Sequence, residues 1–109
     1  MIYELRVYTT VPGRMPNLMA RFRDHTLRIW ERLGVRQVGF FTTLVGPNNN
    51  NQLTYLLAWE SLAEREAKWT VFQADPEWNK ARAESEADGP INAQVDSSFL
   101  LPTDFSALK

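Results

Sequence analysis

The only histidine of this 109-residue chain is His25, within the stretch RFRDHTLRIWERLG. An imidazole titrates near neutral pH, so it can act as a general acid or base or contact a ligand. A half-buried histidine can also be structural, bonded to a carbonyl or to an acidic neighbour. No residue pattern around His25 specifies a reaction, so both interpretations remain open.

Arginines recur at helical spacing around His25 and predict a basic ridge on one helix, formed by Arg14, Arg21, Arg28 and Arg32. Two of them, Arg21 and Arg28, border His25 and are candidate contacts for an anionic ligand group. A solvated helix face explains the same pattern, because exposed ion pairs between neighbouring helical turns are common and contribute little stability.

Two aromatic residues, Tyr3 and Trp59, complete the candidate lining of a ligand cleft. Large aromatic rings line pockets for apolar or aromatic molecules, and they also dominate cores and dimer interfaces. We therefore take His25, Tyr3 and Trp59 as candidate cleft residues. A single histidine without closely spaced carboxylates or cysteines is a weak indication of a metal site, so we predict neither a metal nor a cofactor.

The charge distribution separates two halves of opposite sign. Residues 1–51 hold seven Lys or Arg and three Asp or Glu, whereas residues 52–109 hold five and ten, for a net charge of −1. This balance argues against a nucleic-acid partner and favours halves that pack together. The longest apolar runs fall far below the roughly 18 residues of a membrane span, and we expect a cytoplasmic protein.

Periodicity and turn residues predict six elements in the order β-α-β-β-α-β. A long first helix ends at Gly34, a capping box of Ser61 and Glu64 starts the second helix, and Asp75 restarts that helix before its end. The expected strands are 2–8, 35–46, 52–60 and 91–101, and the expected helices are 15–33 and 62–86.

This order is that of a ferredoxin-like α+β fold in a single domain of residues 1–109. It predicts a four-stranded antiparallel sheet in the order 4-1-3-2 with both helices on one face. Both parities of the second and third strands are apolar, so we expect the helix-free face to close against a second copy as a dimeric barrel. Replacing Phe40 and Phe41 singly with Asp should then dissociate or unfold the protein in at least one case. Glu4 and Arg6 would face the partner.

Five segments, ELRVYTTVPG, VGFFTTLVGPNN, LLAWESLAERE, DPEW and LLPTDFSALK, resemble the NIPSNAP family in order and spacing. The resemblance reaches from end to end of the chain and implies the dimeric α+β barrel. Eukaryotic members of that family are associated with mitochondria and partner binding, and bacterial members mostly lack an assigned activity. No catalytic residue is carried over, because no established family motif maps onto this sequence.

Three functions agree with these patterns. The first is a homodimer that binds a small apolar or aromatic molecule in the cleft between the first helix and the sheet. The second is a non-catalytic dimeric module that recruits another protein. The third is an enzyme similar to cofactor-independent monooxygenases, which bind ligands in such clefts. A pocket lined by His25 would favour small-molecule binding, and a filled interior would favour the module.

Overall fold

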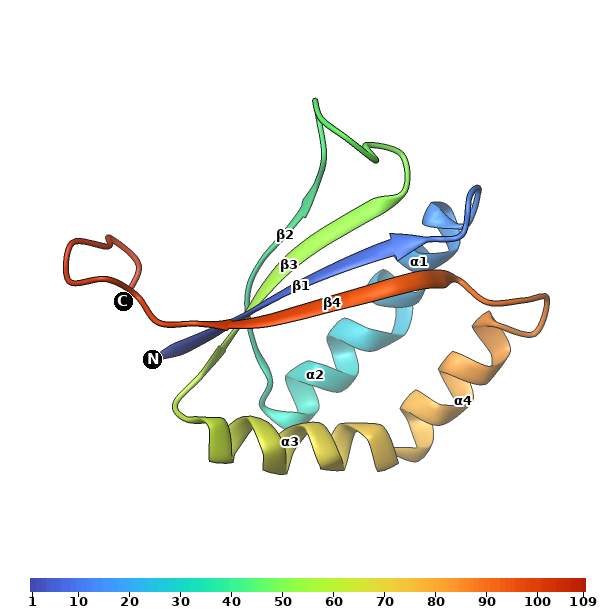
Figure 1. Cartoon of the computed structure of the whole chain (residues 1–109). Helices are drawn as coiled ribbons and strands as arrows, with labels where there is room; N and C mark the ends of the chain where they lie inside the picture. The colour runs from blue at the N-terminus through green and yellow to red at the C-terminus, as the bar shows by residue number, and fades with distance from the viewer.

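The computed structural model describes residues 1–109 and contains the six predicted elements in the predicted order (Figure 1). Each predicted helix is divided into shorter segments. The elements are β1 (Ile2–Thr10), α1 (Met15–Arg21), η1 (Phe22–Thr26), α2 (Leu27–Leu33), β2 (Arg36–Thr42), β3 (Gln52–Trp59), α3 (Leu62–Ala74), α4 (Pro76–Ser85) and β4 (Asn92–Leu100). None of these helices has the length and apolarity that a membrane crossing requires.

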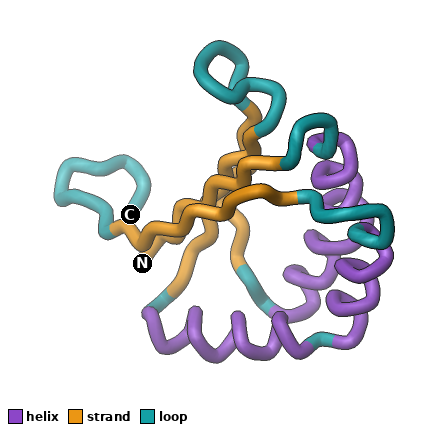
Figure 2. The backbone as a smooth tube through the Cα atoms, turned by 45° about the vertical axis from the view of Figure 1, so that its right-hand side comes forward, coloured by secondary structure: helices purple, strands orange, loops and turns teal.

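The four strands form one antiparallel sheet in the order β2-β3-β1-β4, which confirms the predicted strand order. All helices lie on one side of this sheet, and the other side carries none (Figure 2). The fold is therefore the ferredoxin-like α+β arrangement, with β1 as the strand that joins both halves of the sheet.

The first helix differs from prediction in its middle. Residues Phe22–Thr26 form a π-helical segment between α1 and α2, and the Thr26 hydroxyl donates to the carbonyl oxygen of Arg21 at 3.3 Å. A π-helical turn takes more residues than an α-helical turn, so it rotates the side chains that follow. The helix then ends at Gly34 in the left-handed conformation, with φ 77°, as predicted.

Both predicted caps of the second helical region are present. The Glu64 N–H donates to the Ser61 hydroxyl oxygen at 3.1 Å, and the Glu60 N–H donates to the Glu64 carboxylate at 2.9 Å. The chain breaks after α3 at Asp75, whose carboxylate accepts from the Trp78 N–H at 3.0 Å. The Asp75 cap starts α4 directly after α3 ends, and α4 packs against α1 and η1.

Replacing Ser61 with alanine should lower the free energy of unfolding by about 1 kcal/mol, because the Glu64 N–H loses its acceptor at the helix start. Urea denaturation of Ser61→Ala and the unmodified protein measures the difference. Ser61→Asp is the matched control, since its carboxylate keeps a capping acceptor and should preserve stability. Equal stability of the alanine variant would show that the cap contributes nothing.

An aromatic core fills the space between the first helix and the sheet. The Trp30 ring lies 5.7 Å from the rings of Phe22, Tyr55 and Phe72, measured between centroids, and Phe40 stacks on Tyr55 at 5.0 Å. Trp30 and Tyr55 are fully enclosed. Packing of this density stabilises the sheet against the helices and leaves little room for a ligand at its centre.

The alternation of β1 is opposite to the prediction. Tyr3, Leu5 and Val7 lie on the helix-free face, whereas Glu4 and Arg6 point inward toward the helices. The expectation that Glu4 and Arg6 face a partner subunit is therefore wrong. The charges of Glu4 and Arg6 are compensated inside the protomer. For this reason the side of β1 that carries them can face the core.

Candidate functional site

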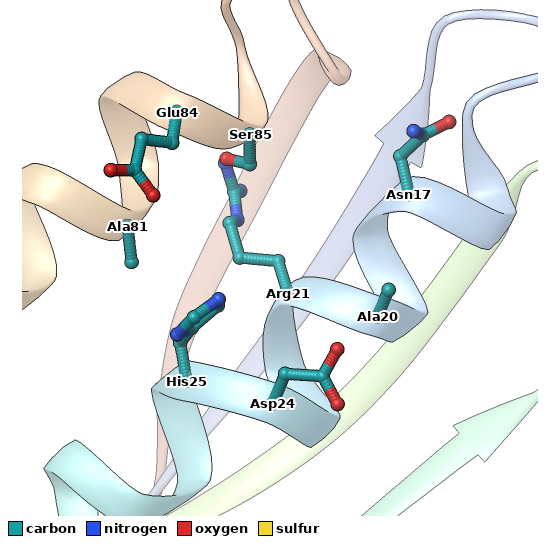
Figure 3. Close-up of a pocket in the computed structure, with 8 residues that line it drawn as sticks. All are labelled: Asn17, Ala20, Arg21, Asp24, His25, Ala81, Glu84 and Ser85. Carbon is teal, nitrogen blue, oxygen red and sulfur yellow. The ribbon is translucent and has the colours of Figure 1, made fainter.

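His25 lies in a surface groove between the first helix and α4, not in a cleft between helix and sheet. The groove encloses about 270 Å³, and Figure 3 shows His25 and Arg21 pointing toward α4 across it. Its lining residues are Asn17, Ala20, Arg21, Asp24, His25, Ala81, Glu84 and Ser85. His25 is half-buried, and it forms no hydrogen bond with the protein.

The two predicted anion contacts already have carboxylate partners. The Arg21 Nη1 donates to the Glu86 carboxylate and to the Ser85 hydroxyl, both at 3.3 Å. Arg28 pairs with the Glu77 carboxylate. Neither guanidinium therefore presents an uncompensated charge to a ligand in this groove.

The whole basic ridge is neutralised in the same way. Each of its arginines pairs with an acidic residue near or within α4, in the pairs Arg14–Asp88, Arg21–Glu86, Arg28–Glu77 and Arg32–Asp75. The basic first half of the chain thus packs against the acidic second half, as the charge distribution predicted. The ridge joins the two halves of the fold.

Tyr3 and Trp59 lie away from His25 and from each other. Tyr3 is on the helix-free face, where its hydroxyl donates to the Lys109 carbonyl oxygen at 2.5 Å. Trp59 is fully buried on the inner face, and its Nε1 donates to Glu4 at 3.1 Å. The prediction that His25, Tyr3 and Trp59 share one cleft is wrong, because the parity of β1 and the π-helical turn place them on different sides of the molecule.

The predicted cleft between the first helix and the sheet is reduced to a small apolar pocket of about 180 Å³. It opens between η1 and the β2–β3 hairpin, and none of the three predicted cleft residues reaches it. Its lining residues are Met19, Phe22, Arg23, Leu27, Phe40 and Leu53.

Truncation of His25 to alanine should change the free energy of unfolding by no more than about 0.5 kcal/mol, since the ring is partly exposed and has no hydrogen-bond partner. Thermal denaturation and sedimentation of His25→Ala should match the unmodified protein. Arg21→Ala is the contrasting variant, because Arg21 is buried and bridges to α4. A marked loss of stability in His25→Ala would assign the imidazole a structural role.

A buried polar cluster lies elsewhere, between β1, β3, β4 and α3. Its centre is Glu4, with no exposed surface, whose Oε1 accepts from Trp59 Nε1 and Arg65 Nε, each at 3.1 Å. The Oε2 atom accepts from Arg6 Nη1 at 2.9 Å, Arg65 Nη2 at 3.1 Å and the Ser97 hydroxyl at 2.8 Å. One carboxylate therefore binds two guanidinium groups.

Arg6 connects this carboxylate to a pair of tyrosines. Its Nε donates to the Tyr55 hydroxyl at 2.7 Å and its Nη2 to the Tyr8 hydroxyl at 3.2 Å, while Tyr55 donates to Tyr8 at 2.8 Å. The Trp69 ring packs against both guanidinium groups, with its centroid 4.7 Å from the Cζ atom of Arg6 and of Arg65. Cation–π contacts of this kind hold guanidinium groups in place away from water.

The cluster fixes the protonation of its members. Burial alone would raise the pKa of Glu4, but hydrogen bonds from Arg65, Ser97 and Arg6 hold it below its ordinary value. Burial also raises the pKa of Tyr55 well above its ordinary value. At neutral pH the cluster therefore contains an ionised Glu4 carboxylate beside a neutral Tyr55 hydroxyl.

A groove of about 340 Å³ borders this cluster on α3, lined by Arg65, Glu66, Trp69, Thr70, Gln73 and Ala74. Arg65 and Trp69 belong to both the groove and the cluster. The inner side of β4 remains uncovered nearby, since Val95 and Phe99 face the helices yet are 44% and 45% exposed. Phe99 also contacts Arg65, with its ring centroid 5.4 Å from the guanidinium carbon.

Sequence reasoning found only part of this cluster. It named Glu4 and Arg6 as residues that face a dimer partner and Trp59 as a cleft residue, and it did not bring the three together. It missed Arg6, Tyr8 and Tyr55 as a unit. Two features of the sequence together could have indicated the cluster. Alternate positions of a central strand carry the charged residues Glu4 and Arg6, and Arg65 lies on the apolar side of a helix.

Comparison with known proteins places the chain in one family. The family model described as NIPSNAP matches residues 3–107. No curated protein matches the chain.

Among solved structures, the chain is similar to Atu4242 from Agrobacterium tumefaciens, with 27% identity, a TM-score of 0.84 and complete coverage of both chains. It is also similar to an uncharacterized NIPSNAP-like domain protein from Burkholderia xenovorans, with 28% identity, a TM-score of 0.83 and coverage of 96% of this chain and 87% of that one. A putative antibiotic biosynthesis monooxygenase from Nitrosomonas europaea shares the fold alone, at 8% identity, a TM-score of 0.64 and coverage of 94% and 98%. With its predicted resemblance matched over nearly its full length, the chain belongs to the NIPSNAP family.

Proposed function

We propose that this protein is a homodimeric barrel that binds a small organic molecule with an aromatic or apolar body in the groove on α3. The observation that carries this proposal is the buried cluster of Glu4, Arg6 and Arg65 beside Trp69 at the wall of that groove. We place the protein in the cytoplasm as part of the same proposal.

The energetics of the cluster support a binding role. Desolvating an ion pair costs several kcal/mol per ion, and well-packed apolar side chains of similar volume stabilise a fold as well or better. This core is otherwise aromatic and tightly packed. Charged residues with spare hydrogen-bond donors at the edge of a groove are the arrangement by which ligand pockets orient their occupants.

The helix-free face supports the homodimer. Its central rows carry half-buried Leu5, Val7 and Leu56, and Phe41 is 57% exposed beside them. An apolar sheet face of this kind is covered most simply by the same face of a second copy around a two-fold axis. The dimer would leave the groove on α3 accessible, since the groove lies on the helical side of the sheet.

Two alternatives remain open to experiment. The fold shared with the Nitrosomonas europaea protein, titled a putative monooxygenase, supports an enzymatic use of the groove only at the level of fold. A non-catalytic interaction module is favoured by the exposed apolar residues Leu44, Val45 and Phe105 in the hairpin loop and the tail. Ligand occupancy of the groove separates the module from the other two.

Native mass spectrometry of protein purified from its own host tests the proposal. The unmodified protein should carry additional mass, and Trp69→Ala should lose it because Trp69 walls the groove. His25→Ala is the matched control, since it alters the groove beside α4 and should retain the mass. Protein that carries no additional mass, or a mass retained by Trp69→Ala, contradicts the proposal.

A further inference from the structure

We infer that the occupant of the groove on α3 is a small organic anion, a carboxylate attached to an aromatic or apolar body, recognised by Arg65. This inference rests on the proposed binding function and adds the chemical class of the ligand. It follows from the charge, the free donors and the walls of the site.

The cluster holds one more positive charge than negative. Glu4 is the only carboxylate that forms an ion pair with Arg6 or Arg65, and it is shared between them. Elsewhere in the fold, a bridging arginine has a carboxylate that no second buried arginine shares. Arg14, for example, pairs with Asp88. Two guanidinium groups on one carboxylate leave a net charge of +1 at the groove wall, where surrounding apolar rings weaken solvent screening.

Hydrogen-bond donors remain available in the same place. The protein takes three of the five N–H groups of Arg6 and two of the five of Arg65. The Arg65 Nη1 makes no hydrogen bond, and Arg65 lines the groove. A planar guanidinium with free donors binds a carboxylate in two-point geometry, which neither a hydroxyl nor a neutral amide reproduces.

The walls set the nature of the rest of the ligand. Trp69 lines the groove, and the partly exposed Phe99 ring contacts Arg65 from β4. A volume of about 340 Å³ lies at the lower end of the roughly 300–1,000 Å³ that ligand pockets occupy, so the body is small. Glu66 also lines the groove, but it is exposed and forms no ion pair, so water screens its charge.

Isothermal titration with matched probes tests the inference. Phenylacetate should bind at least tenfold more tightly than 2-phenylacetamide, which has the same shape without the charge. Acetate and inorganic phosphate should bind more weakly than phenylacetate, because they lack the aromatic body. These two probes distinguish an organic carboxylate from a simple anion site.

Substitutions locate the binding. Arg65→Gln should reduce phenylacetate affinity to that of the amide, and Arg65→Lys, which keeps the charge but loses the two-point geometry, should give an intermediate affinity. Arg23→Gln is the control of equal charge change, since Arg23 is exposed and lies at the apolar pocket beside η1. Circular dichroism verifies that each variant is folded, and the lysine variant provides the test if the glutamine variant is not.

Each outcome has a separate meaning. If phenylacetate and phenylacetamide bind equally in the groove, the protein binds small molecules and the inference of an anion is overturned. If phosphate binds as tightly as phenylacetate, the site binds anions of any kind, and the inference that the ligand has an aromatic or apolar body is overturned. If no probe binds and the host-purified protein is also empty, the proposed function itself fails.

Discussion

Replacing Glu4 with leucine is expected to lower the free energy of unfolding by about 3–5 kcal/mol, because the change leaves Arg6 as a buried cation without its counter-charge. The Trp59 indole N–H and the Ser97 hydroxyl lose their acceptor at the same time. Urea denaturation measures the loss. For a domain of this size it is a large part of a total stability of roughly 5–15 kcal/mol.

The control is an ion pair at the surface. Glu60 pairs with Arg36 and both side chains are exposed, so Glu60→Leu removes a carboxylate from a pair that water can screen. That change should cost no more than about 1 kcal/mol. If Glu4→Leu and Glu60→Leu have similar costs, the buried carboxylate does not hold the interior together.

The pH dependence of the free energy of unfolding follows from the lowered pKa of Glu4. A carboxyl whose folded-state pKa lies below its ordinary value of 4.5 contributes all its stability above about pH 4.5 and loses it as pH falls through the folded-state pKa. Because Glu4→Gln cannot titrate, the difference in melting temperature between it and the unmodified protein should stay constant at higher pH. Below about pH 4.5 the difference should shrink, and a constant difference down to pH 3 would contradict the lowered pKa.

The fold could be predicted because local signals determine it. Ser61 and Asp75 cap helices through their own neighbours, and Gly34 ends a helix by its backbone conformation. The element order then restricts the sheet to few arrangements, of which the observed strand order is the favoured one. No contact between distant residues is needed for any of these steps.

The face of β1 could not be predicted by the same reasoning. Polarity alone assigns Glu4 and Arg6 to the outside and Tyr3 to the inside, and the structure has the reverse. The inward orientation is stable only because Arg65, from a helix more than fifty residues later, shares the carboxylate. A charged side chain is stable in the interior only when distant residues compensate it, and the periodicity of a strand gives no information about such residues.

The predicted position of His25 was wrong for a different physical reason. Its predicted place in a cleft beside the sheet assumed a regular α-helix over residues 15–33. The π-helical segment Phe22–Thr26 lies within that interval and changes the rotation, so the ring meets α4 instead of the sheet. Helix propensities do not specify such a segment, since it forms where packing on both sides requires it.

The second large effect is expected at the helix-free face, where Phe41→Asp should convert the protein into a folded monomer. Phe41 is 57% exposed and lies in register with Thr54 of β3. In an isologous dimer a single substitution appears twice in one interface, so two carboxylates would be desolvated. We expect the dissociation constant of the dimer to rise at least about hundredfold, which corresponds to about 2.7 kcal/mol.

Phe40→Asp distinguishes this effect from unfolding. Although Phe40 is the next residue, it points to the helices and stacks on Tyr55, so a carboxylate there should unfold the protomer. Sedimentation velocity at micromolar concentration and circular dichroism together should show a folded monomer for Phe41→Asp and loss of structure for Phe40→Asp. Leu56→Asp, on the same face as Phe41 but in the neighbouring strand, provides an independent variant of the interface.

The results for Phe40→Asp and Phe41→Asp test two things: which face of the sheet each side chain lies on, and whether the helix-free face forms the dimer. If Phe41→Asp and Leu56→Asp both remain folded dimers, the two copies associate through another surface. A monodisperse monomer of the unmodified protein would leave the apolar face without a second copy. In that case the exposed rows around Leu5 and Phe41 would have to be covered by a different protein, which is the arrangement that the interaction-module alternative requires.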